Sequence, residues 1–351
     1  MEKDITPNSP KSVFKFYSLT DYNLDAFLNH YLFTSHPYHL NDLMDNKGYT
    51  IDMRNVTEEL YEALRQQIVH QAPLIVNAPK YDQLSFETDR NTNILQKAIY
   101  DSFFCFGGII SLSTQDRFNE LMWSHYTNDT GFMIEFDTRI LLNSIYDNIL
   151  NRSINQLYFR PIQYKKYLQS ISCFKNPNIQ YINLYNSTQK LKDWSYENEW
   201  RIIATSYQFL GVPKSIYEQD PQYTDTSKRK LFYSPNAIKR IFLGKKFWTI
   251  ENIDQEIISE SNNDFRTYIV KEKLKQFIYA LCNGTRRQLY MSGACDCSEF
   301  RHGTDNIGDS YDPDHYYLTR SFEQIKNINI NGQVVNVEYE GIVKTQNEDF
   351  E

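Results

Sequence analysis

Hydrophobic and polar residues alternate in some parts of the chain and recur with helical spacing in others. Residues 12–19 (SVFKFYSL) alternate, and at 107–114 two glycines lead into an apolar run that ends in small polar residues, so both segments predict strands. After Thr57, apolar side chains recur at positions 60, 64 and 68, which predicts a helix. A further helix is expected near 21–30, followed by a short strand at 31–35.

The segment 121–137 (LMWSHYTNDTGFMIEFD) combines both patterns. Apolar side chains and one His recur with helical spacing, which predicts a helix capped by Asp116. A turn at 128–131 leads to a strand in which Phe132, Ile134 and Phe136 share one face. The opposite face of this strand carries Glu135. The apolar stripe expected on the helix consists of Phe118, Leu121, Met122 and His125.

The remaining elements predict an α+β fold with a mixed, mainly antiparallel sheet core and surrounding helices. Strands and helices are intermixed without the regular spacing of βαβ units, which argues against a doubly wound sheet. The pattern changes near residue 251, so we expect a core domain over 1–250 and a C-terminal elaboration, 251–351, packed on it. Strands are expected near 156–164, 196–204, 237–244 and 334–343, and helices near 91–103, 138–150, 181–193, 252–260 and 269–282.

Composition and charge restrict the class of protein. The net charge of −7 argues against a nonspecific nucleic-acid binder, which usually has a basic face. The first residues, MEKDITPNSPK, lack the apolar region of a signal peptide, and no apolar run approaches the ~18–20 residues needed to cross a bilayer. The five Cys are an odd number and widely spread, which fits a reducing compartment. The expected location is the cytoplasm, away from membranes.

The stretch 196–202 (YENEWRI) is a first candidate for chemistry. On a strand, Glu197, Glu199 and Arg201 share one face. This face is either an exposed surface with a Glu–Arg pair or part of a pocket. The apolar residues 202–204 that follow favour the pocket, because a Glu on a central strand needs a partner.

A second candidate lies at the end of the helix near residue 121. Trp123, His125 and Tyr126 either pack in the core or line a pocket with aromatic surface and polar tips. A metal site is not expected, because the Cys pair near residue 296 is CxC and not the CxxC of zinc ribbons. The chain also lacks a P-loop, GxGxxG, HExxH and GxSxG, so the common nucleotide-binding and hydrolase families lose support. The side chains considered for zinc are Cys282, Cys295, Cys297 and His302.

Five segments together resemble an uncharacterised bacterial family, domain of unknown function 2971. The resemblance extends over about residues 12–250 and brings no established activity with it. Its two most specific parts are the LMWSHY…GFMIEFD stretch and the WSYENEWR stretch. The segments, in order, are FKFYSL (14–19), ISLST (110–114), LMWSHYTNDTGFMIEFD (121–137), KDWSYENEWRII (192–203) and AIKRIFLG (237–244).

The order of motifs is also similar to that of the ADP-ribosyltransferase-like fold, sometimes built as a split two-sheet core. That resemblance implies NAD as substrate, held by a first-strand side chain, a Ser-x-Ser strand and stacking aromatics. A Glu, often within Glu-x-Glu, stabilises the positive charge that forms as nicotinamide leaves. The first position departs from the pattern, with Lys15 or Tyr17 where Arg or His is usual. By this resemblance the catalytic residues are Glu199, Glu197 and His125, and the NAD-binding residues are Lys15, Tyr17, Ser111, Ser113, Trp123 and Tyr126.

Three functions therefore remain open. The first is an ADP-ribosyltransferase or NAD glycohydrolase, acting as a toxin or defence effector on a protein or nucleic-acid acceptor. The second is a non-catalytic module that binds a ligand or a partner protein in an aromatic cleft. The third is a metal-independent hydrolase or nuclease that uses His125 with Glu135 or Glu199. The sequence does not predict an oligomeric state.

Overall fold

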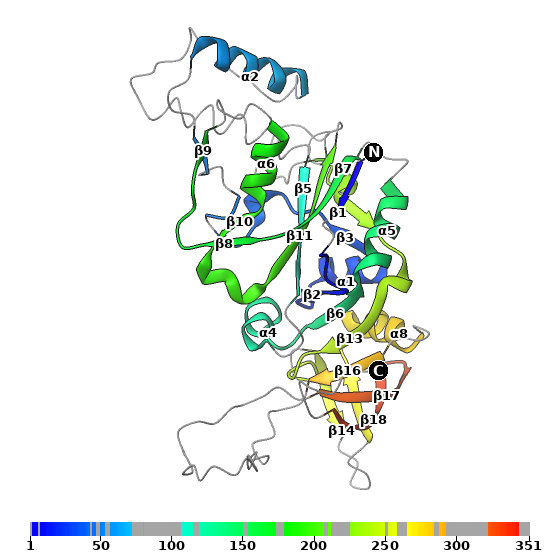
Figure 1. Cartoon of the computed structure of the whole chain (residues 1–351). Coiled ribbons are helices and arrows are strands. Elements are labelled where there is room, and N and C mark those ends of the chain that lie inside the picture. Colours follow the sequence, from blue (N-terminus) through cyan, green and yellow to red (C-terminus); the bar gives the residue numbers. More distant parts are fainter. Residues whose placement is uncertain are drawn as a thin grey trace, which may run out of the picture. The chain divides into compact units, whose positions relative to one another are not determined.

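A computed structural model shows the helices and strands of the chain (Figure 1). The chain forms two compact units, each assembled from separate stretches of sequence. Unit 1 comprises residues 1–13, 30–114 and 138–237, and unit 2 comprises residues 14–29, 115–137 and 238–351. The structure describes residues 2–5, 8–42, 44–46, 50–52, 57–71, 80, 107–114, 119–149, 154–172, 179–206, 210–211, 225–249, 252–257, 265–283, 288–292 and 322–343.

The main sheet of unit 1 is organised around β11 (Glu199–Ser206). This strand pairs antiparallel with β5 (Gly107–Ser113) on one side and with β7 (Ile154–Pro161) on the other. Strand β1 (Glu2–Ile5) adds to β7 in parallel. Three two-stranded pairs complete the unit: β10 (Gln189–Leu191) with β8 (Gln163–Lys165), β12 (Lys230–Phe232) with β3 (Tyr31–Phe33), and β4 (Ile51–Asp52) with β9 (Ile171–Ser172).

One helix and one arginine contribute much of the packing within unit 1. Helix α5 (Thr138–Ile149) buries Leu141, Leu142, Ile145 and Ile149, a spacing that places them on a single face. A fully buried Arg229 ties separate segments together through carbonyl oxygens, with its guanidinium donating to Gly211, Thr34 and Gly107. Further helices are α2 (Glu58–Gln71), α6 (Ile179–Ser187) and the 3₁₀ helix η3 (Lys192–Glu197).

In unit 2 the strands follow the order β2-β6-β13-β16-β17-β18-β15-β14. Neighbouring strands from β6 onward are antiparallel except β13 and β16, which are parallel. The mixed, mainly antiparallel sheets with helices around them confirm the predicted α+β class. The strands are β2 (Ser12–Tyr17, of which 14–17 belong to unit 2), β6 (Phe132–Asp137), β13 (Ile238–Leu243), β14 (Ile253–Ile257), β15 (Phe265–Val270), β16 (Gln288–Ser292), β17 (Phe322–Asn331) and β18 (Val334–Val343).

An aromatic cluster forms the core of unit 2. The ring centroids of Phe27 and Phe277 lie 4.9 Å apart, and each ring also contacts Phe132. Tyr17 stacks on Phe132, and the edge of Trp123 meets Phe16, at centroid distances of 5.1 and 5.4 Å. Aromatic residues make up 15% of the chain, and some of them thus form this core. The helices that supply or cover these rings are α1 (Asp21–Leu28), α4 (Glu120–Thr127) and α8 (Lys275–Asn283).

Some predicted elements are wrong, mostly in the C-terminal part. The helix expected at 252–260 is the strand β14, whose charged residues between two isoleucines suit an exposed edge strand. The helix expected at 269–282 begins only at residue 275, because residues 265–270 carry the Thr, Tyr, Ile and Val that favour a strand. The helix expected at 91–103 lies outside the described residues. The expected division into a core domain and a C-terminal elaboration at residue 250 stays a prediction. The two compact units are a different division, because unit 2 combines earlier segments with residues 238–351.

Candidate functional site

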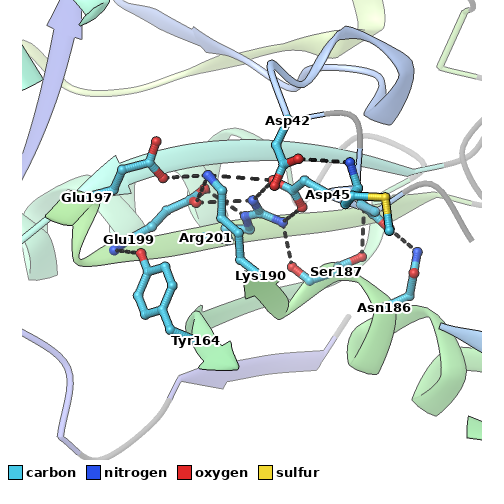
Figure 2. A network of polar contacts seen from close by, with 11 residues as sticks. Asp42, Asp45, Tyr164, Asn186, Ser187, Lys190, Glu197, Glu199 and Arg201 are labelled. Atoms are coloured by element: carbon cyan, nitrogen blue, oxygen red, sulfur yellow. Dashed lines mark hydrogen bonds and ion pairs between the residues drawn. The ribbon is translucent and has the colours of Figure 1, made fainter. Parts of the chain in front are cut away.

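Five buried charged side chains meet at the start of β11 in unit 1 (Figure 2). Each of these residues is at most 5% exposed, although its side chain is charged. Burial of this many charges requires close pairing, because an unpaired charge in the interior costs several kcal/mol. The members of this buried ion network are Asp45, Lys190, Glu197, Glu199 and Arg201.

Arg201 lies at the centre of the buried ion network and has a partner for each of its five N–H groups. Its Nε and one terminal nitrogen donate to the two carboxylate oxygens of Glu199, at 2.7 and 3.1 Å. The two terminal nitrogens also donate to the carboxylate of Asp45, and one of them donates to the carbonyl of Ser187 at 2.8 Å. This use of the planar guanidinium fork fixes the geometry of both carboxylates.

Lys190 joins the two glutamates. Its Nζ donates to Glu197 and, at 3.2 Å, to Glu199. It also lies 3.8 Å from the carboxylate of Asp45 and 4.7 Å from the ring centroid of Trp194, a cation–π contact. The burial of Lys190 would lower its pKa, but the neighbouring carboxylates of Glu199 and Glu197 outweigh burial and raise the pKa above its usual value. The ammonium group therefore stays charged.

The backbone explains why both glutamates reach the same lysine. Helix η3 ends at Glu197, and Asn198 then adopts a left-handed conformation with φ of 45° before the strand begins at Glu199. Asn tolerates this conformation better than most residues. On a continuous strand, Glu197 and Glu199 would share one face because they are two residues apart. Here Glu197 is instead held by the end of η3, and Glu199 by the start of β11. The local strain thus accompanies the buried ion network, as often seen at functional sites.

The adjacent strand supplies hydroxyl groups. Ser113 pairs with Glu199 in the register of β5 and β11, and its hydroxyl donates to the carbonyl of Glu197 at 2.6 Å. The Ser111 hydroxyl donates a hydrogen bond to the Glu199 carboxylate. From the other side, the backbone N–H of Glu199 donates to the Tyr164 hydroxyl at 2.8 Å (Figure 2). The predicted Ser-x-Ser and Glu-x-Glu motifs are therefore in direct contact.

Electrostatics keep Glu199 ionised despite its burial. Burial alone would raise the pKa of Glu199, but the cations of Arg201 and Lys190 and the hydrogen bonds from Arg201 and Ser111 lower it to about 2. Across the buried ion network, three carboxylates face two cations, which gives a formal charge of −1 when all five groups are ionised. A shielded site with excess negative charge favours a ligand or transition state that carries positive charge.

Residues 122–202 match a family model described as "Protein of unknown function (DUF2971)". The match supports the resemblance to this family and covers less than a quarter of the chain. The matched region includes Lys190, Glu197, Glu199 and Arg201, whereas Asp45 and Ser111 lie outside it. Neither the search of curated proteins nor that of solved structures found a match.

The other expected site residues lie in unit 2. Tyr17 and Trp123 are core residues, 4% and 0% exposed, and their aromatic neighbours explain their presence without a ligand. Lys15 and Tyr126 are half-buried, and their expected contacts with NAD stay predictions. The residues that the structure brings together in unit 1 are Ser111, Ser113, Glu197 and Glu199.

Two expectations about exposure can be compared with the structure. The face of Glu197, Glu199 and Arg201 was expected to be either a solvated surface or part of a pocket, and the solvated surface is excluded because partners from distant segments cover the face. His125 is exposed and does not lie on a buried stripe of α4. The expected stripe is wrong because α4 turns another face to the core, on which Met122, Trp123 and Thr127 are buried; its N-cap is Asn119 and not Asp116.

Three members of the site were missed by sequence reasoning. Asp45, Lys190 and Tyr164 belong to segments without a recognisable motif, and Asp45 is 156 residues away from its partner Arg201. The local geometry around Asp45 is a turn, in which its N–H donates to the Asp42 carbonyl at 3.2 Å and Asn46 has a positive φ. A possible signal was the composition of 41–46, NDLMDN, which is rich in turn-forming residues.

Glu135, the alternative partner of His125, has a different environment in unit 2. It is 3% exposed, and its carboxylate pairs with Lys239 at 3.0 Å and with Arg240 at 3.2 Å. Arg240 also donates to the Gln288 side chain at 3.0 Å. This arrangement resembles the surroundings of Glu199 in charge and burial, which makes Glu135 a suitable reference residue for mutagenesis.

Metal and membrane features can be assessed only in the described part of the chain. There, no group of three or more His, Cys, Asp or Glu side chains is placed to hold a metal ion. Cys282 is half-buried, and the remaining residues considered for zinc, Cys295, Cys297 and His302, lie outside the described residues. Within the same described ranges, no helix is both long and apolar enough to cross a membrane.

Proposed function

We propose that the protein is an NAD-consuming enzyme of the ADP-ribosyltransferase type, with Glu199 as its catalytic carboxylate. The observation that supports this proposal most is the state of Glu199. It is buried, ionised and hydrogen-bonded to Ser111 of the Ser-x-Ser strand. Such chemistry requires a carboxylate that is shielded from water and still charged.

In the proposed reaction, the bond between nicotinamide and the ribose carbon breaks, and its electron pair leaves with nicotinamide. Positive charge then develops on the ribose, and Glu199 stabilises it within a buried ion network of formal charge −1. The acceptor forms the new bond to the ribose carbon and loses a proton. Arg201 and Lys190 act as positioning residues, because they hold the carboxylate of Glu199 in one orientation.

In this proposal, NAD approaches the carboxylate at the start of the strand. Glu199 is the first residue of β11, and the preceding Asn198 is exposed. Trp194 and Tyr196 on η3 are half-buried, and their rings lie 6.1 Å apart. The proposal therefore requires a small shift of η3 or of the Asn198 turn when NAD binds, so that the ribose reaches Glu199.

One observation favours a second candidate, a non-catalytic module in which the buried ion network only stabilises the fold. The Glu199 carboxylate accepts from Arg201 twice, from Lys190 and from Ser111. These four donors match the roughly four acceptor positions of a carboxylate, so no position is left for a substrate hydroxyl unless one donor moves.

The two candidates differ in one experiment. The full-length protein is titrated with NAD in a calorimeter, and nicotinamide release is then assayed for wild type, Glu199→Gln and Glu135→Gln. The enzyme proposal expects NAD binding in all three proteins and loss of release in Glu199→Gln alone. Glu135→Gln is the matched control, because it also removes a buried carboxylate charge that has Lys and Arg partners. Absence of binding and of release from wild type would favour the non-catalytic module.

A further inference from the structure

A basic and aromatic surface lies directly beside the buried ion network. Lys165, Lys166 and Lys192 are exposed, and Tyr167 is 72% exposed, the most of any large hydrophobic side chain in the described part of the chain. The ammonium of Lys166 lies 5.3 Å from the ring centroid of Tyr167. We name this set, together with the half-buried Trp194, the β8–η3 surface: Lys165, Lys166, Tyr167, Lys192 and Trp194.

The fold brings these residues together from two segments. Strand β8 runs parallel to β10, and their register places Lys165 opposite Leu191. Helix η3 begins at the next residue, Lys192, and contacts β8. The pairing of the two backbone segments therefore brings the three lysines close together.

The β8–η3 surface is connected to the proposed catalytic carboxylate by adjacent residues. Tyr164 accepts a hydrogen bond from the backbone N–H of Glu199, and Lys165 is the next residue of the chain. On the other segment, Trp194 faces the ammonium group of Lys190, which in turn bonds to Glu199. A partner bound on this surface would therefore lie next to the two segments that contact Glu199.

The chemistry of the β8–η3 surface fits unpaired bases and phosphates. An exposed Tyr and a half-buried Trp offer faces on which bases stack, and lysines between them pair with phosphates. A protein partner is less well matched, because Lys is depleted in the centres of protein interfaces. Asp193 is the single acid among the exposed residues of 163–170 and 189–196, so the exposed charge of these segments is positive although the whole chain carries −7.

We propose that the β8–η3 surface binds single-stranded nucleic acid and presents it to Glu199 as the acceptor. The acceptor role rests on the proposed function, whereas the binding itself does not. Three lysine–phosphate contacts predict that the logarithm of the binding constant falls with the logarithm of salt concentration with a slope of about −2. The stacking contact predicts that Tyr167→Ala weakens binding by roughly 5- to 100-fold.

The test is fluorescence anisotropy of a short labelled oligothymidylate with the full-length protein at several salt concentrations. The double variant Lys165→Ala/Lys166→Ala is expected to bind about tenfold more weakly or worse, with a slope reduced to about −0.7. The matched control is Lys245→Ala/Lys246→Ala, which removes two adjacent exposed lysines from unit 2. Its affinity and slope should equal those of wild type.

Three results would overturn the inference: no binding by wild type, equal loss in both double variants, or equal affinity for a duplex of the same length. The last would indicate attraction by charge without stacking. Nicotinamide release measured on the same samples separates the two proposals. Release without oligonucleotide binding would refute the acceptor surface and leave the enzyme intact. Binding without release would establish the surface and refute the proposed function.

Discussion

Replacement of Arg201 by Met is the strongest perturbation of the buried ion network that preserves side-chain length. Arg201 is fully buried and donates five hydrogen bonds, to Asp45, Glu199 and the Ser187 carbonyl. The variant leaves two buried carboxylates without their main cation. Loss of one partner of a buried ion pair typically costs about 3–5 kcal/mol of unfolding free energy. For a unit of the size of unit 1, that corresponds to a decrease in melting temperature of roughly 6–20 °C.

The assay is thermal and urea unfolding followed by circular dichroism, with Arg240→Met as the control. Arg240 also pairs with a buried Glu, but its side chain is 14% exposed and Glu135 keeps Lys239 as a second partner. We expect the control to lose about 1–2 kcal/mol. Where more than one transition is observed, the transition that moves in Arg201→Met is the one to compare. A loss below about 1 kcal/mol, or equal losses in both variants, would refute the reasoning, since it would mean that water replaces the guanidinium.

Two further outcomes are expected. The folded-state pKa of Glu199 is lowered from 4.5 to about 2, so its ionised form stabilises the protein above about pH 4.5, and this contribution is lost as the pH falls toward 2. The stability difference between wild type and Glu199→Gln, measured by urea unfolding, should therefore shrink over that range; a difference independent of pH would contradict it. Gly131→Ala should destabilise unit 2 by more than about 2 kcal/mol, because the added Cβ would lie 2.0 Å from the carbonyl oxygen of Tyr17; an unchanged melting temperature would show that this contact is looser.

Local pattern was sufficient to predict much of the fold. The alternation in 12–19 and 132–137 and the apolar run at 107–114 correspond to β2, β6 and β5. These segments have a strong period, and the strands they form are buried on at least one face. The segment 252–260 has a weak period and many charges, so an edge strand could not be told from an exposed helix.

The candidate site was only partly predictable. The contact between the Ser111 and Glu199 strands followed from a resemblance in motif order, and the shared face of Glu199 and Arg201 followed from strand alternation. The burial of that face could not be predicted, because it depends on Asp45 and Lys190. Asp45 comes from a short turn far away in the sequence, and a single Lys near a strand is ordinarily an exposed residue. Long-range pairing of charges leaves no periodic signal in a single sequence.

The central claim is that Glu199 is a catalytic carboxylate and not only a structural one. The most direct measurement is the rate of nicotinamide release from NAD by Glu199→Gln and Glu135→Gln, at a temperature and pH at which both variants are folded. We predict that Glu199→Gln is slower than wild type by roughly 100- to 1,000-fold, the usual effect of removing one group that stabilises transition-state charge. Glu135→Gln should retain the wild-type rate. Equal release rates in the two variants would contradict the claim and assign the buried ion network to fold stability alone.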